Sequence, residues 1–142
     1  MKRAADMLVL ISVVVLLGAL GCSAPTKSDT ARLQGTWQGD EVGADMKGKC
    51  SLIVSGAHWE FHGGDTNEWY KGDFSLREDA NPKQIVLLIS ECSASQFIGK
   101  TSYGLYRFEN DTVTLAVNKP GNSKAPLNFE APGSRQFVLK QQ

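Results

Sequence analysis

The residues best suited to chemistry are the chain's two histidines, which flank a glutamate in the segment His58-Trp59-Glu60-Phe61-His62. Side chains alternate between the two faces of a β-strand, so His58, Glu60 and His62 share one face. Imidazole and carboxylate groups so arranged are ligands for zinc or copper. If Trp59 and Phe61 face the core, however, the polar trio faces solvent, where no surrounding shell fixes the imidazoles. We expect this solvated face and no metal.

Cys50 and Cys92 are the cysteines that remain if Cys22 carries a lipid. An exported protein can oxidise such an even pair to a disulfide. A bridge across this sequence separation is worth about 3–4 kcal/mol in the chain-entropy model. We expect the bridge at the loop-bearing end of the fold; two partly buried free thiols are the alternative.

Four aromatic residues on predicted strands, Tyr70, Phe74, Tyr106 and Phe108, are the candidate ligand-binding residues. An eight-stranded barrel holds a small ligand only where side chains leave its interior open. The alternative is that these residues are core, and the number of aromatic side chains favours a largely filled interior.

The sequence contains no Gly-x-Ser-x-Gly, phosphate loop, Cys-x-x-Cys or His-Glu-x-x-His pattern. Because both histidines lie in one segment, no histidine elsewhere can act as a general acid or base. The 15 basic and 15 acidic residues balance, unlike the basic surface of a nucleic-acid-binding protein. We therefore predict no enzyme, no cofactor and no nucleic-acid partner.

The elements that must position these residues are predicted to be strands at about 35–42, 49–55, 58–62, 68–76, 84–90, 101–109, 112–118 and 135–140. Asp29 is expected to cap a short helical turn at 30–33. The continuous apolar run from Ile85 to Ile89 predicts a strand covered on both faces. Eight antiparallel strands of this length favour a closed up-and-down barrel, because closure removes unpaired edges.

The connections between these strands are unequal. The segments at 43–48, 63–67, 91–100 and 119–134 are long or glycine-rich, whereas Gly56-Ala57, Asn81-Pro82 and Asn110-Asp111 lie in tight turns. In an up-and-down barrel alternate connections lie at opposite ends. The long loops therefore share one end, the mouth, and the chain enters the first strand from the closed end.

The N-terminus reads as a lipoprotein signal peptide, which is removed before the domain 35–142 reaches its final location. Lys2 and Arg3 precede an apolar run at 7–20, which is shorter than the ~20 residues of a transmembrane helix. The run ends in Ala19-Leu20-Gly21-Cys22, which resembles the bacterial lipobox. We predict cleavage after residue 21, palmitate-type acylation of Cys22, and a tether with the helical turn at 22–34; a plain signal peptide is the alternative.

Several segments resemble lipocalin-like domains, in which a helical turn precedes a Gly-x-Trp on the first strand, as in Leu33-Gln34-Gly35-Thr36-Trp37. Together with Gly72 to Leu76, Pro82 to Ile85 and Gly104 to Tyr106, they are similar to an uncharacterised lipocalin-like family expanded in planctomycete bacteria. The similarity spans about 29–140. It implies an eight-stranded barrel with no established activity.

Trp37 is expected to plug the base of the barrel under the helical turn; a cavity wall is the alternative. The sequence departs from the family where Ala125-Pro126 replaces Arg-Pro and Lys140-Gln141 replaces Lys-Arg. The usual arginine partner of the strand-one tryptophan is therefore missing, with Lys140 or Arg135 as replacements.

Two hypotheses for function follow. The first is a monomeric, lipid-anchored cell-envelope protein, facing the periplasm or the cell exterior, whose mouth binds a small apolar or amphipathic molecule. The second is a solid barrel that binds or inhibits another envelope protein through its loops, with Phe97 and Ile98 as exposed contacts. A cavity of roughly 300 Å³ or more opening between the loops distinguishes the first from the second.

Overall fold

The computed structural model describes residue 21 and residues 23–43 and 48–142. Most of the predicted signal peptide, the lipidation site Cys22 and residues 44–47 of the first long loop lie outside the described residues. Within the described ranges, no helix is long and apolar enough to cross a membrane.

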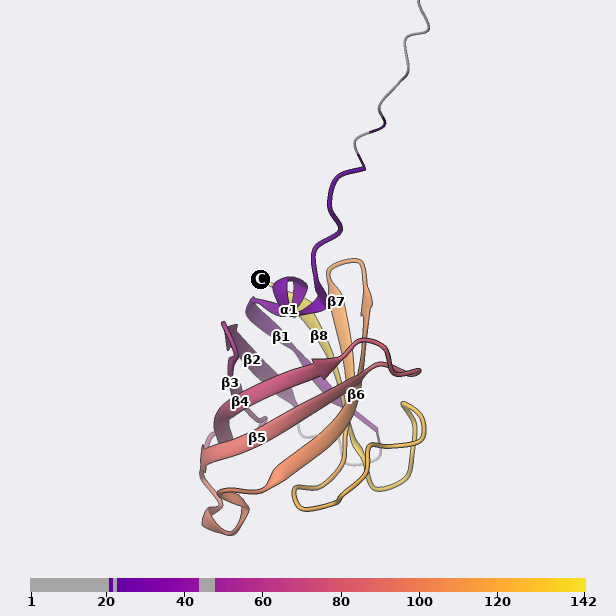
Figure 1. Cartoon of the computed structure of the whole chain (residues 1–142). Helices are drawn as coiled ribbons and strands as arrows, with labels where there is room; N and C mark the ends of the chain where they lie inside the picture. Colours follow the sequence, from indigo (N-terminus) through magenta and orange to yellow (C-terminus); the bar gives the residue numbers. More distant parts are fainter. Residues whose placement is uncertain (1–20, 22, 44–47) are drawn as a thin grey trace, which may run out of the picture.

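Eight antiparallel strands form one closed barrel in chain order (Figure 1). They are β1 (Gly35–Val42), β2 (Lys49–Ser55), β3 (His58–His62), β4 (Trp69–Arg77), β5 (Gln84–Cys92), β6 (Thr101–Glu109), β7 (Thr112–Val117) and β8 (Arg135–Gln141). Each strand pairs with the next, and β8 closes the sheet on β1. The predicted strands are confirmed to within two residues at each end. All of this pairing lies within residues 35–141, so the barrel is a self-contained unit.

Two glycines allow neighbouring strands to approach more closely than a side chain would permit. A Cβ atom at Gly39 would lie 1.9 Å from the carbonyl oxygen of Val138, and one at Gly72 would lie 1.7 Å from that of Leu88. The register between β4 and β5 also shifts at Lys71/Gly72. Bulges and glycines of this kind bend a sheet, so these positions help it to close.

The two ends of the barrel differ as predicted. The two shortest connections, at 56–57 and 110–111, share one end with the connection at 78–83, and the other connections share the opposite end. The connection at 78–83 is as long as those at 43–48 and 63–68, so it is not the tight turn expected around Asn81-Pro82. The helical turn α1 (Asp29–Leu33) lies at the end with the short connections, where the chain before it also leaves the barrel (Figure 1). Ser28, rather than Asp29, caps α1: its hydroxyl accepts a hydrogen bond from the Ala31 N–H at 3.2 Å.

Asp29 instead fastens α1 to the closed end. Its buried carboxylate accepts hydrogen bonds from Lys83 Nζ at 2.6 Å and from the Tyr106 hydroxyl at 2.8 Å. Burial alone would raise the pKa of Asp29, but these bonds and the charges of Lys83 and Arg32 outweigh it and hold the pKa below its ordinary value. A carboxylate with a lowered pKa in the folded state stabilises the fold while it is ionised.

Replacing Asp29 by asparagine is therefore expected to lower the free energy of unfolding by about 1–3 kcal/mol at neutral pH. The difference from the native chain should shrink as the pH falls below about 4, where the unfolded carboxyl binds a proton and the native advantage is lost. Urea unfolding at several pH values measures it. The matched variant Asp111→Asn breaks only the exposed 3.6 Å pair with Lys140 and should have little effect at any pH.

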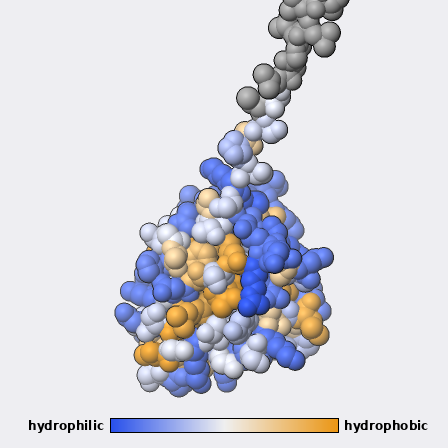
Figure 2. Space-filling model, viewed as in Figure 1, coloured by the Kyte–Doolittle hydropathy of each residue, from blue (hydrophilic) through white to orange (hydrophobic). Residues whose placement is uncertain are grey.

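The prediction that β5 is covered on both faces is wrong. Val86 is half-buried and Leu88 is 41% exposed, so the strand is covered only on its inner face. Figure 2, viewed from the same side as Figure 1, shows apolar side chains at this surface. The reason is architectural, since a closed barrel has a single interior and α1 covers only its base.

Candidate ligand-binding site

A cavity of about 330 Å³ lies inside the barrel and reaches its loop-bearing end. Leu33 of α1 lies among its lining residues on the closed side, and Lys119, Pro120 and Gly133 of the β7–β8 loop line its other side. The volume is at the lower end of the ~300–1,000 Å³ typical of ligand pockets. The expectation of a largely filled interior is therefore wrong for this part of the barrel.

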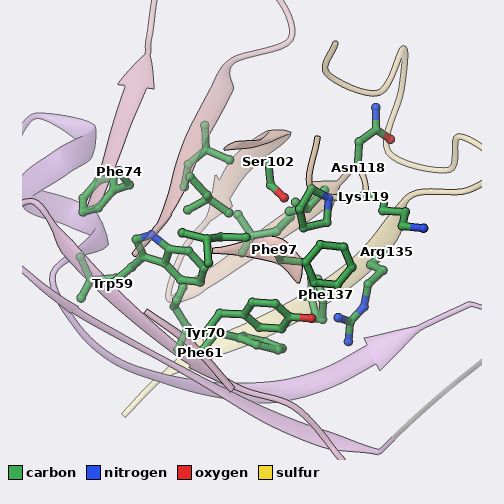
Figure 3. Close-up of a pocket in the computed structure, with 18 of the residues that line it drawn as sticks. Trp59, Phe61, Tyr70, Phe74, Phe97, Ser102, Asn118, Lys119, Arg135 and Phe137 are labelled. Carbon is green, nitrogen blue, oxygen red and sulfur yellow. The ribbon is translucent and has the colours of Figure 1, made fainter. Parts of the chain in front are cut away.

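The cavity is polar at one end only. Trp59 and Phe74 lie at one end, and Asn118, Lys119 and Arg135 at the other (Figure 3). The walls between them are mostly aliphatic and aromatic side chains. Such a surface suits a molecule that buries an apolar part and keeps a polar part near the mouth.

Two of the four predicted ligand-binding aromatics, Tyr70 and Phe74, line the cavity. The prediction that they bind a ligand is consistent with this position. Burial, followed by the charge of Glu68, raises the pKa of Tyr70, so its hydroxyl stays neutral at physiological pH.

Tyr106 and Phe108 do not line the cavity, which corrects their assignment as ligand-binding residues. Their rings pack edge to face, with centroids 5.8 Å apart, at the closed end. The Tyr106 hydroxyl is bound to Asp29, and the guanidinium of Arg32 lies 4.2 Å from the Phe108 ring centroid. These side chains fill the base of the barrel, at the end of β6 that leads into the tight turn at 110–111.

Trp37 is 1% exposed and belongs to the same base, as predicted. Its indole N–H donates to the carbonyl oxygen of Leu33 at 2.8 Å, and its ring lies 6.2 Å from that of Phe108. Neither expected replacement for the missing arginine contacts it. Lys140 forms an exposed pair with Asp111, and Arg135 lies at the opposite end.

Arg135 is held by two acidic residues at the polar end of the cavity. Glu41 accepts two hydrogen bonds from the guanidinium, both at 2.8 Å, and Glu68 accepts two more. Burial alone would lower the pKa of Arg135, but the bonds and charges of the two carboxylates outweigh it and raise the pKa. The guanidinium also lies 5.2 Å from the ring centroid of Phe137.

This cluster was not anticipated from the sequence, although one signal was present. Alternation along β1 puts Glu41 on the same inward face as Trp37, and an acidic side chain there requires a cation. Glu41 is indeed 6% exposed. Its partner could not be identified because Arg135 is 94 residues away in the chain.

His58, Glu60 and His62 lie on the outer face of β3 and are engaged by neighbours. His58 Nδ1 lies 2.5 Å from an oxygen of Asp73, and His62 Nε2 lies 2.6 Å from Glu60. The hydrogen bond from His62 lowers the pKa of Glu60. Among the described residues, no three such side chains converge on a point that could hold a metal ion.

Cys50 and Cys92 both lie at the mouth, as expected, but both are free thiols, so the structure does not contain the predicted bridge. Strands β3 and β4 separate them, and three strand spacings of ~4.8 Å far exceed the ~7 Å Cα separation that a disulfide can span. Burial, helped by Glu41, raises the pKa of Cys50 to about 11. Cys50 is therefore a protonated, unreactive side chain at neutral pH.

Comparison with known proteins adds no assignment, since no protein-family model, curated protein or solved structure matches this chain.

Proposed function

We propose that this chain is a lipid-anchored protein of the bacterial cell envelope whose lipocalin-like barrel binds a small apolar or amphipathic molecule. The observation that carries the proposal is the 330 Å³ cavity with apolar walls. Filling such a space removes apolar surface from water, at about 25 cal/mol per Å². A bound apolar group also makes dispersion contacts with these walls.

The position of α1 supports the proposed anchoring geometry. The chain before α1 leaves the barrel at the closed end, opposite the loops (Figure 1). A lipid on Cys22 would therefore hold the base of the barrel toward the membrane and leave the mouth accessible.

The lining of the cavity favours binding over catalysis. Among the described residues that line it, there is no carboxylate, imidazole or thiol that could serve as a general acid, base or nucleophile. We therefore infer a binding protein rather than an enzyme.

A protein partner at the mouth is the second candidate. It is favoured by Leu127, which is 90% exposed in the β7–β8 loop, and by Ile98 in the β5–β6 loop. The cavity favours the first candidate, because a solid barrel that acts only through its loops has no need of one.

One experiment tests both anchoring and binding. The full chain is expressed in a bacterium, extracted from the envelope and analysed by native mass spectrometry. We expect a covalent mass consistent with a chain that starts at a lipidated Cys22, and a non-covalent adduct of a small molecule. An uncleaved or unacylated chain would contradict the anchoring; a protein without adduct that takes up no added amphiphile would contradict the binding function.

The matched variants Val117→Phe and Val86→Phe test whether the adduct binds inside the cavity. Val117 lines the cavity, whereas Val86 lies on the outer face of β5. The first variant should lose the adduct and the second should keep it. Equal loss in both would point to a site outside the barrel.

A further inference from the structure

The charged side chains around the cavity indicate which kind of polar group its ligand carries. Arg135 is the more buried of the two cations that line the cavity, and four of its hydrogen bonds already go to Glu41 and Glu68. One positive and two negative charges leave this cluster with a net charge of −1. The guanidinium has five N–H donors, so one remains for a ligand, and a ligand carboxylate that binds through two hydrogen bonds would have to displace one of the two glutamates.

Lys119 does not reverse this balance. It is exposed at the edge of the cavity, and its single charge offsets the net charge of the arginine cluster. Together, Arg135, Lys119 and the two glutamates that bind Arg135 carry no net charge. Moving an anion from water into such a site costs free energy that no unpaired buried cation repays.

Ser102 is the more buried of two hydroxyl-bearing wall residues, the other being Tyr70, whose side chains form no hydrogen bond to another described residue. It is 4% exposed, its hydroxyl is directed into the cavity, and it makes no hydrogen bond to another described residue (Figure 3). A hydroxyl both donates and accepts hydrogen bonds. Left without a partner when an apolar ligand displaces water, it would cost free energy that a polar ligand group avoids.

We propose that the cavity takes an uncharged amphiphile, such as an alcohol, amide or ester of one alkyl chain. Its polar group binds Ser102, and its chain extends toward Trp59 and Phe74. The volume of 330 Å³ accommodates about ten heavy atoms at the ~30 Å³ that one water occupies in the liquid. This inference rests on the proposed binding function and adds the class of ligand.

The test uses three probes with the same chain: decanol, decanoate and decyltrimethylammonium. Titration calorimetry on residues 23–142, which retain α1 and the whole closed barrel, gives their affinities. We expect decanol to bind at least about tenfold more tightly than either ion, because only the ions must shed their hydration in a neutral site. Replacing Ser102 by alanine should weaken decanol binding about two- to tenfold, the range of one hydrogen bond.

The outcomes separate this inference from the function on which it rests. Decanoate binding as tightly as decanol, or decanol binding unchanged in Ser102→Ala, would overturn the inference and leave the cavity as a binding site. Failure of all three probes would count against the binding function itself. Ser75→Ala, the same substitution on the exposed outer face of β4, controls for general effects on the barrel and should bind decanol as the native chain does.

Discussion

Replacing Trp37 by alanine is expected to lower the free energy of unfolding by about 3–5 kcal/mol, the range for deleting a buried aromatic side chain. Trp37 is 1% exposed and contacts Phe108 within the base of the barrel. Its indole N–H also satisfies the carbonyl oxygen of Leu33, at the last residue of α1. The substitution therefore opens a void and removes one of the hydrogen bonds that hold α1 on the barrel.

Urea denaturation followed by circular dichroism measures this loss. Trp69→Ala is the matched control, because Trp69 is half-exposed. The Lys71 ammonium lies 5.5 Å from the centroid of the Trp69 ring. We expect the control to cost about 1 kcal/mol or less. Equal losses in the two variants would mean that Trp37 does not support the base as its burial indicates.

The strands and the two ends of the barrel could be predicted because they depend on local patterns. Alternation such as Trp59 and Phe61 against His58 and His62 is complete within a few residues, and it fixes which face turns inward. The difference between tight turns and long loops is equally local. Together they predicted the closed end and the mouth, whereas the place of Trp37 was implied by the resemblance to lipocalin-like domains.

Which part of the interior is filled could not be predicted with the same rule, because every inward aromatic looks alike. The distance of a residue from the nearest turn accounts for only some of the positions, since Val54 and Trp59 flank the tight turn at 56–57 and yet line the cavity. Tyr106 and Phe108 lie just before the tight turn at 110–111, so they fill the base. Tyr70 follows the loop at 63–68, so it lies near the mouth.

The local sequence patterns could not predict contacts between residues that are far apart in the chain. The pairing of Glu41 with Arg135 depends on the closure of β8 on β1 and on the position of the β3–β4 loop that carries Glu68. The separation of Cys50 from Cys92 depends on the number of strands between them. Both are properties of the closed sheet rather than of any one segment.

Replacing Arg135 by methionine is expected to lower the free energy of unfolding by about 3–5 kcal/mol, because it leaves buried carboxylates without their cation. Arg135 donates two hydrogen bonds to Glu41 and two to Glu68. The side chain of Glu41 is only 8% exposed, so water cannot readily replace the bonds that Glu41 would lose. Methionine keeps much of the apolar volume beside Phe137, so the loss reports mainly the charge. Urea denaturation at neutral pH and moderate salt measures it.

Two further variants decide whether the loss comes from unpaired charge. Adding Glu41→Gln and Glu68→Gln to Arg135→Met removes the orphaned carboxylates and should restore a large part of the lost stability. Arg107→Met is the matched control, since the Arg107 side chain is half-exposed near Phe129 and Glu109 and should cost about 1 kcal/mol or less. A triple variant no more stable than Arg135→Met would show that the guanidinium acts through packing on Phe61 and Phe137. In that case the polar end of the cavity would be stabilised by its aromatic contacts rather than by the balance of charge from which an uncharged ligand was inferred.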